Sequence, residues 1–311
     1  MTDSVMLKGD DFVNRYRLEG KLTATSPFHL GSGFMVERKG LDNEKTKKPI
    51  QVSAIATDHS GHPVIPGSSL KGTLRGYLLN VLSTVNDNQQ KKNAETLAND
   101  HDYDKLCTRD DLKNQKGQIV FMRKDASVLE RLFGTPFAEG KIEVWDGECV
   151  PTEYQIDDSI KDSESPPCWN SKRFTYVDQS VAINPETNTA IDKNLYSFEI
   201  VPPGVTFAIN ICGQNLGEIE LGMLIFGLEA FNSEIWPLTL GAMGGRGFGR
   251  FSFELTKLYC LKKDNISNWI KEAICNRHSG YFSLKRLDES EKKKSIECFR
   301  KAFLKAVGDA R

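Results

Sequence analysis

Without its long polar stretches, this chain reads β-α-β-β-α-β, the split βαβ order of ferredoxin-like folds. Its strand segments alternate apolar and polar residues or are short apolar runs bounded by Gly and Pro. Its two helical segments repeat apolar residues every three or four positions. This order predicts an α+β, ferredoxin-like body. The segments that carry the prediction are residues 16–25, 62–85, 140–150, 195–211, 215–234 and 251–261.

Each predicted helix presents one apolar face, which indicates that it packs on the sheet. Ser68 or Ser69 is a natural N-cap for the first helix, because a short hydroxyl side chain can bond to the backbone N–H groups of a helix start. The residues expected to face the core are Leu70, Leu74, Tyr77, Leu78 and Val81 in the first helix, and Leu216, Ile219, Met223, Phe226 and Ala230 in the second.

Two polar stretches interrupt the pattern and are predicted to be insertions. Residues 84–118 read as an insertion or a loop, whereas residues 151–195 contain short alternating segments typical of a projecting β-hairpin. We therefore expect one α+β domain over residues 1–263, which contains both insertions. The charged, helix-like residues 264–311 are expected to form a helical C-terminal extension.

The bulk composition leaves the partner undecided. The 41 Lys and Arg residues nearly balance the 42 Asp and Glu residues, so a polyanion site has to come from local clustering of charge. The 7 cysteines form no Cys-x-x-Cys pair, which disfavours a structural zinc site. The sequence has no run of about 18 apolar residues and no signal-peptide pattern, so we expect a cytoplasmic protein without a membrane partner.

A glycine-rich segment, GAMGGRGFGRF (residues 241–251), lies between the second helix and the last strand. Part of it is similar to the RNA-stacking strand of an RRM, but that strand precedes the second helix of an RRM and this one follows it. A Walker A loop is excluded because the chain has no G-x-x-x-x-G-K-[ST] motif. An anion-binding nest beside Arg246 and Arg250 and a simple flexible turn remain open.

The segment PGSSLKGTLR (residues 66–75) provides a second junction suited to anions. It predicts free backbone N–H groups, two hydroxyls and the positive end of a helix dipole at one point. Ser68, Lys71 and Arg75 would form a stripe along the first two helical turns. Two such junctions on one small core favour a shared track for a polyphosphate chain over two unrelated turns.

In this order, IPGSSLKGTLR, RLFGTP and GAMGGRGFGRF resemble the signature of the RAMP superfamily of CRISPR-associated proteins. Three further segments are similar to backbone subunits of type III effector complexes: TSPFHLGSG, residues 181–207 and residues 228–251. The resemblance covers residues 15–260. Each loop is a weak signal alone, but six ordered segments are specific as a set.

The resemblance implies a fold like a right hand, with an RRM-like palm and with the insertions as fingers and thumb. It also implies that copies or paralogues stack into a filament along a CRISPR guide RNA, hold its backbone and present it to target RNA, while base pairing supplies the specificity. Carried over to this chain, the RNA contacts fall on His29, Ser68, Ser69, Lys71 and Arg75, and on Gly244, Gly245, Arg246, Gly247, Phe248, Gly249 and Arg250.

Some related subunits cut target RNA with an aspartate and a divalent metal, Mg²⁺ or Mn²⁺. Alignment on Pro49 puts Lys47 or Lys48 where the resemblance requires that aspartate. Asp42, displaced by several residues, is the nearby candidate, and a solvated loop carboxylate is the competing interpretation. The sequence therefore leaves open whether this chain is an endoribonuclease, and it defines no metal ligands.

Two functions follow from the resemblance. The first is a guide-RNA-binding backbone subunit, active or inactive as a nuclease. The second is a stand-alone endoribonuclease that processes CRISPR RNA, which usually needs a histidine near the first helix. His59 and His62 precede that helix but have no obvious acid partner in the sequence, which favours the first function.

Overall fold

A computed structural model provides the fold, which is α+β with mainly antiparallel sheets and a C-terminal helix. The structure describes residues 5–42, 49–86, 96–99, 101–151, 170, 173–183, 185–187, 189–275 and 285–308.

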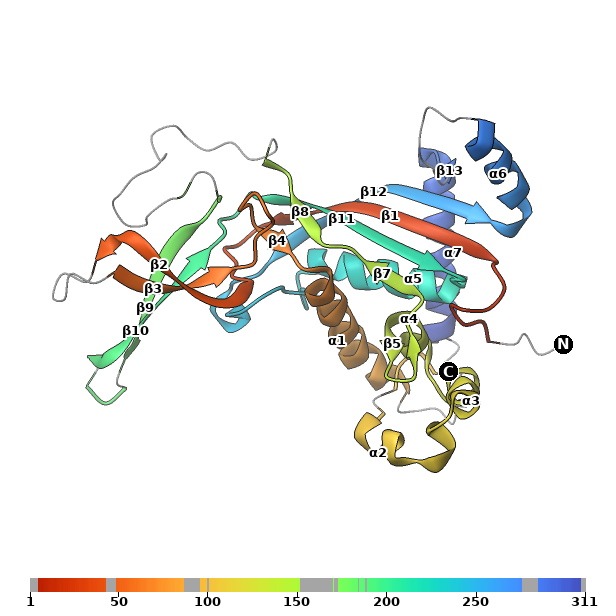
Figure 1. Cartoon of the computed structure of the whole chain (residues 1–311), viewed down its shortest axis with the longest axis horizontal. Helices are drawn as coiled ribbons and strands as arrows, with labels where there is room; N and C mark the ends of the chain where they lie inside the picture. The colour runs from red at the N-terminus through yellow and green to blue at the C-terminus, as the bar shows by residue number, and fades with distance from the viewer. Residues whose placement is uncertain are drawn as a thin grey trace.

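A seven-stranded antiparallel sheet forms the body of the molecule (Figure 1). Its strands follow the order β13-β12-β1-β11-β8-β4, and β7 pairs with β11 beside β8. The strand predicted over residues 140–150 is thus two short strands, separated by Trp145 and Asp146. The strands are β1 (Asn14–Ala24), β4 (Val64–Ile65), β7 (Ile142–Val144), β8 (Gly147–Cys149), β11 (Thr206–Gln214), β12 (Phe251–Lys262) and β13 (Lys285–Arg286).

One face of this sheet is covered by helices and forms the main core (Figure 1). The alternation in β1 turns Tyr16, Leu18 and Leu22 towards that core, as the sequence predicts. The covering helices are α1 (Gly67–Asn86), α4 (Val128–Phe133), α5 (Glu218–Glu229) and α7 (Glu289–Gly308). In α1 the buried stripe is Leu70, Leu74, Leu78 and Leu82.

Helix α5 is buried on more sides than the sequence predicts. Ile219 and Phe226, two of its expected core residues, are each 37% exposed. The buried set instead includes Leu221, Leu224, Ile225 and Leu228. The reason is close packing on two flanks: Gly227 contacts Leu74 and Leu78 of α1, and Gly222 contacts Phe299 and Phe303 of α7.

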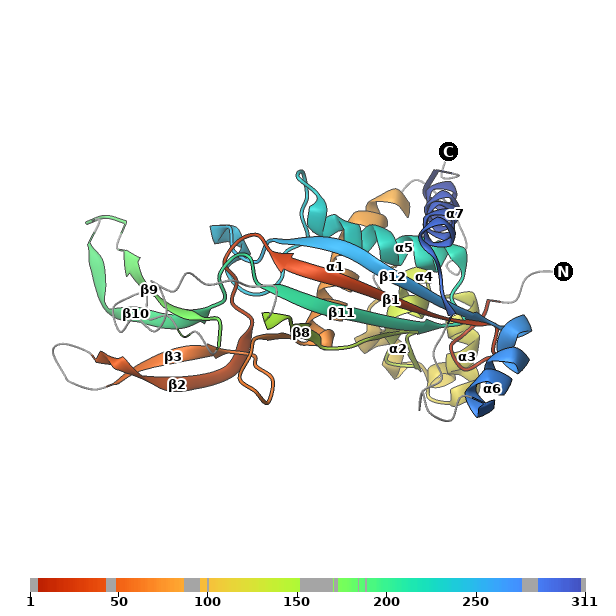
Figure 2. The same ribbon diagram turned by 90° about the horizontal axis from the view of Figure 1, so that it is seen from above.

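A four-stranded sheet projects from one end of the body (Figure 2). Its order is β2-β3-β10-β9, in which the hairpins β2–β3 and β9–β10 meet through a parallel pairing of β3 with β10. The projecting hairpin that the sequence predicts within residues 151–195 corresponds in part to β9 and β10, and residues 152–169 lie outside the described residues. The strands are β2 (Gly31–Asp42), β3 (Pro49–Ile55), β9 (Tyr176–Ile183) and β10 (Ala190–Ile200).

The polar stretch expected as an insertion or a loop is largely helical from residue 103 onward. Residues 103–118 contain α2 (Tyr103–Thr108), a 3-10 turn (Asp110–Leu112) and the start of α3 (Gln115–Lys124). These helices have their own small core, in which Phe121 and Met122 are buried. Asp102 and Asn114 cap the two helices, so local capping outweighs the low hydrophobicity of the segment.

The C-terminal extension is helical and joins the main core. Helix α6 (Ile266–Cys275) lies at the far end of β12, and α7 returns across α5 (Figure 1). Phe299 of α7 packs edge-on against Tyr16 of β1, with ring centroids 5.9 Å apart.

The contact of α5 with α7 gives a stability prediction. A Cβ at Gly222 would lie 2.3 Å from the Phe299 carbonyl oxygen, so Gly222→Ala should lower the free energy of unfolding by about 1–3 kcal/mol. The matched control is Gly76→Ala in α1, where a Cβ meets nothing within 4 Å. That variant should gain about 0.5–1 kcal/mol from helix propensity. Chemical denaturation measures both, and equal effects of the two substitutions would contradict the packing argument.

Candidate nucleic-acid interface

The glycine-rich segment is an ordered loop fixed to the connection between β1 and β2. The N–H of Ala242 donates to the His29 carbonyl at 2.9 Å, and the N–H of Gly249 donates to the Pro27 carbonyl at 2.9 Å. The loop turns through left-handed backbone at Gly241 (φ 88°) and Gly249 (φ 77°). These bonds attach both ends of the loop to that connection.

The glycines of this loop do two different things. A Cβ at Gly241 would lie 2.4 Å from the His29 carbonyl oxygen, and one at Gly249 would lie 2.2 Å from the Leu240 carbonyl oxygen. Both positions therefore need glycine for packing. At Gly245 and Gly247 a Cβ would meet nothing within 4 Å, so their backbone faces open space that a ligand can approach.

The two arginines of the loop differ in their surroundings. Arg246 crosses to the projecting sheet, where its Nη2 donates to the Tyr196 hydroxyl at 2.7 Å. Arg250 is exposed, and its backbone joins the loop to the end of β1 through Thr25 and Ser26. Phe248 is half-buried against Phe198, with ring centroids 6.5 Å apart.

His29 is a buried support of this loop. Its Nδ1–H donates to the Glu199 carbonyl at 2.6 Å, so its Nε2 is the acceptor that faces the Ser53 hydroxyl at 3.4 Å. Burial lowers the pKa of the imidazole, which favours its neutral form. The side chain is 7% exposed, so His29 positions the loop and offers little surface to a ligand.

The start of α1 differs from the prediction in two respects. The helix begins at Gly67, so Ser68 and Ser69 lie in its first turn rather than at the N-cap. The N–H groups are also less free than predicted: Gly67 donates to Asp146 Oδ1 at 2.7 Å, and Ser69 and Leu70 donate to the Pro66 carbonyl. A carboxylate from the β7–β8 connection, distant in sequence, thus caps this helix.

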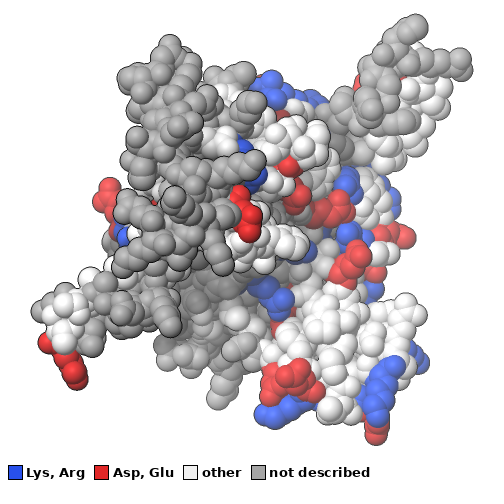
Figure 3. All heavy atoms as spheres, turned by 60° about the vertical axis from the view of Figure 1, so that its left-hand side comes forward, with Lys and Arg blue, Asp and Glu red and all other residues white. Residues whose placement is uncertain are grey.

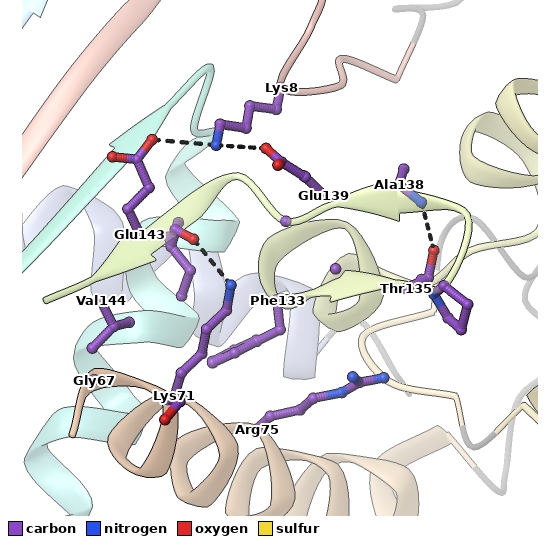
Figure 4. A pocket seen from close by; sticks show the side chains of 15 residues that line it. Lys8, Gly67, Lys71, Arg75, Phe133, Thr135, Ala138, Glu139, Glu143 and Val144 are labelled. Atoms are coloured by element: carbon purple, nitrogen blue, oxygen red, sulfur yellow. Dashed lines mark hydrogen bonds and ion pairs between the residues drawn. The ribbon is translucent and has the colours of Figure 1, made fainter.

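A groove of about 710 Å³ runs along the first two turns of α1 (Figure 4). Ser68, Lys71 and Arg75 line one side of it, as the predicted stripe requires. The opposite side is the RLFGTP segment, of which Phe133, Gly134, Thr135 and Pro136 are lining residues. Ser69 and the glycine-rich loop are not among the residues that line this groove.

Charge in the groove is partly compensated. Lys8 lies between two carboxylates, 3.1 Å from Glu139 and 3.2 Å from Glu143. Lys71 is half-buried, donates to the Ile142 carbonyl at 3.2 Å, and has a lowered pKa because of burial. Arg75 extends beneath the turn between β5 (Gly134–Thr135) and β6 (Ala138–Glu139) (Figure 4). An anion in the groove would therefore meet Arg75, Lys71 and the Ser68 hydroxyl.

The superfamily assignment follows from the sequence match that spans these elements. The RAMP superfamily model matches residues 21–252, from β1 to the start of β12. The chain belongs to the RAMP superfamily. No curated protein has a matching sequence. Membership suggests CRISPR-related RNA binding, since RAMP proteins act with CRISPR RNA and other CRISPR-associated subunits.

The predicted site residues of this RAMP protein fall into two groups. Ser68, Lys71 and Arg75 share the groove, and His29 lies against the glycine-rich loop. Backbone pairing links the groups: the N–H of Ala56 donates to the Leu30 carbonyl, and the N–H of Val64, just before α1, donates to the Ala56 carbonyl.

The candidate catalytic aspartate ends strand β2. The backbone of Asp42 pairs with that of Pro49, whereas its side chain and Lys47 and Lys48 lie outside the described residues. In the part of the chain that the structure describes, no three His, Cys, Asp or Glu side chains are grouped so that they could hold a metal ion. The metal ligands and the catalytic role of Asp42 therefore stay predictions.

One of the two histidines before α1, His62, has an acid neighbour that was not obvious from the sequence. His62 Nδ1 lies 3.7 Å from Asp58 Oδ2, which corrects the expectation of no acid partner. The other oxygen of Asp58 accepts from the N–H groups of Ser60 and His62, so this carboxylate stabilises the turn. His62 also packs on Phe174, with ring centroids 5.7 Å apart.

Two further observations concern the surface charge and the character of the helices. Basic and acidic side chains are interspersed over the described part of the face in Figure 3, in line with the formal net charge of -1. Among the described residues, no helix combines the length and the apolar character needed to cross a bilayer.

Sequence reasoning missed three residues of the candidate site: Lys8 lines the groove, Asp146 accepts from the N–H of Gly67, and the Tyr196 hydroxyl accepts from Arg246. Lys8 and Asp146 stand in polar contexts that carry no signal of their own. Tyr196 carries a weak signal, because Tyr196, Phe198 and Ile200 alternate with polar residues and so predict an apolar, partly aromatic row on one face of a strand.

The two kinds of glycine in the loop give a prediction. Gly249→Ala combines a left-handed backbone with a clash against Leu240 and should lower the free energy of unfolding by about 1–3 kcal/mol. Gly245→Ala should stay within about 0.5 kcal/mol of the wild type because its Cβ meets nothing. Thermal and chemical unfolding measure both, and a neutral Gly249→Ala variant would show that the loop is not held by this contact.

Proposed function

We propose that this RAMP protein is a CRISPR-RNA-binding backbone subunit of a type III RNA-guided interference complex. The observation that carries the proposal is the groove between two separate signature segments, IPGSSLKGTLR and RLFGTP. The first segment contributes the basic residues Lys71 and Arg75 to its lining. A groove open along α1, with Ser68, Lys71 and Arg75 on one side, suits a phosphate backbone rather than a compact ligand.

The architecture supports a right-hand arrangement for this subunit. The order β12-β1-β11-β8, with α1 and α5 on one face, is what a ferredoxin-like palm requires. The four-stranded sheet would supply the thumb and part of the fingers, because it projects from the body next to the glycine-rich loop (Figure 2).

The binding mode would be contact with the RNA backbone. Arg75, Lys71 and Ser68 would meet phosphates in the groove, while Gly244, Gly245 and Gly247 would let the strand approach the loop beside Arg246 and Arg250. Such contacts position a nucleic acid without reading its sequence. Pairing of the guide with target RNA would supply the specificity, and sister subunits would continue the track as a filament.

Removing the basic stripe tests this proposal. The double variant Lys71→Ala with Arg75→Ala should bind guide RNA more weakly, and the slope of log K against log salt should fall by about one to two phosphate charges. Fluorescence anisotropy at several salt concentrations measures both quantities.

The matched control removes two lysines near the opposite edge of the sheet, next to β12 rather than β7 and β4. Lys263→Ala with Lys271→Ala deletes the same charge from the turn after β12 and from α6. It should leave the salt slope unchanged. If both double variants weaken RNA binding equally, the loss comes from the lower net charge and not from the groove, which would contradict the proposal.

Target RNA cleavage, as an added activity, would depend on Asp42 with Mg²⁺ or Mn²⁺. Asp42→Ala in the assembled complex should then remove the cleavage products at the position of this subunit while guide binding stays intact. Gel analysis of labelled target RNA measures the products, with Asp264→Asn, an exposed carboxylate in the turn after β12, as the control. A complete product ladder from Asp42→Ala would assign this chain a binding role alone.

The alternative function is a stand-alone endoribonuclease that processes CRISPR RNA. The pair of His62 and Asp58 is the observation in its favour. That pair supports a turn and packs on Phe174, which favours a structural role. Cleavage of precursor RNA by the purified chain, lost in His62→Ala, would reverse this preference.

A further inference from the structure

The projecting sheet has two chemically different faces. On one, Val36, Val52 and Val177 form a small apolar core. On the other, the pairing register aligns Met35, Ser53 and Phe198 in one row and places Tyr196 beside Ser180 in the next row on that side. This second face contacts the glycine-rich loop through Arg246 and Phe248.

Tyr196 is the most exposed aromatic ring at that contact. It is 42% exposed, while Phe198 next to it is 4% exposed. The two rings are nearly parallel, with centroids 5.9 Å apart and an interplanar angle of 24°. Arg246 fixes the position of the tyrosine, because it donates to the hydroxyl and places its guanidinium carbon 5.8 Å from the ring centroid. The Tyr196 ring is thus fixed in position, and part of its surface stays accessible.

The charges around Tyr196 favour a neutral partner over a phosphate. The same face carries the carboxylates Glu37 and Asp178, which flank the aromatic rows. These carboxylates offset the charge of Arg246, which already donates to the Tyr196 and Ser180 hydroxyls, so a phosphate gains little there, whereas an uncharged base does not depend on that charge. The open backbone of Gly245 and Gly247 lies in the same loop as Arg246 and leaves room for the sugar-phosphate chain.

We propose that Tyr196, held by Arg246 and backed by Phe198, stacks on one unpaired nucleobase of a bound single-stranded RNA. Stacking on an aromatic ring tolerates every base, so this contact adds affinity without sequence reading. The inference rests on the proposed RNA-binding function and names a base contact beside the phosphate groove.

The test uses the full chain and short oligoadenylate in which one position is made abasic in turn. Tyr196→Leu should lower the affinity for intact oligoadenylate about tenfold. The salt slope should not change, because no phosphate contact is lost. Tyr196→Phe keeps the ring and should stay within about twofold of the wild type. An abasic position that weakens wild-type binding about tenfold should have no further effect in Tyr196→Leu.

The matched control is Trp145→Leu. Trp145 is 47% exposed and also has an arginine over its ring, with the Arg17 guanidinium carbon 5.3 Å from the centroid. It lies between β7 and β8 of the seven-stranded sheet and is not part of the projecting sheet, and its loss should leave the affinity unchanged. An independent readout on the wild-type protein is 2-aminopurine placed along the oligonucleotide, whose fluorescence should be quenched most at the stacked position.

The outcomes separate this inference from the function on which it rests. If wild-type binding responds to Lys71→Ala with Arg75→Ala but not to Tyr196→Leu, the stacking contact is overturned and the phosphate groove stands. If Tyr196→Leu weakens intact and every abasic oligonucleotide equally, the tyrosine is only a latch for the loop and stacking is overturned. If the chain binds no RNA, both proposals fall.

Discussion

A buried polar junction at Glu199 holds the two sheets and the glycine-rich loop in one arrangement. Its carboxylate is 1% exposed and accepts from the N–H of Ile55 and from the Arg173 guanidinium, both at 3.1 Å. Its backbone carbonyl holds His29, whose own carbonyl binds the glycine-rich loop at Ala242. A buried carboxylate is costly unless it is paired, so Glu199 needs these donors at the same point where its backbone holds His29. The direction of the projecting sheet and the position of the loop therefore depend on one set of interactions.

Sequence patterns predicted the parts of the fold that local periodicity controls. The alternation in β1 and the leucine stripe of α1 correspond to their buried faces, because one face of each element meets solvent. The exposed Ile219 and Phe226 show where such patterns fail. Helix α5 is packed on two flanks through Gly222 and Gly227, so its burial follows from neighbours distant in sequence. The segment around α2 and α3, expected as an insertion or a loop, has helices that no hydrophobic periodicity announced, since its core is small and its helices are capped by Asp102 and Asn114.

Only the part of the candidate site that lies within helix α1 was predictable from the sequence. Ser68, Lys71 and Arg75 share a helical face by spacing alone, and the structure places them in one groove. Two other interactions join segments about 50 to 80 residues apart, so no local sequence pattern could predict them. Asp146 accepts from the N-terminus of α1, and Arg246 donates to Tyr196. The same applies to Gly241 and Gly249, whose role as packing glycines appears only when the His29 and Leu240 carbonyls lie against them.

The balance of charge limits how strongly a single copy of this chain can hold RNA. Lys8, Lys71 and Arg75 line the groove together with Glu139 and Glu143, which leaves one excess positive charge, and Asp146 at the α1 N-terminus offsets it. Phosphate contacts that are few in each subunit give weak binding that salt screens readily. Under the proposed function, affinity would then come from repetition, because subunits joined along one guide RNA bind it as linked sites with a high effective concentration. A near-neutral surface suits that arrangement, since strongly basic copies would repel one another when packed side by side.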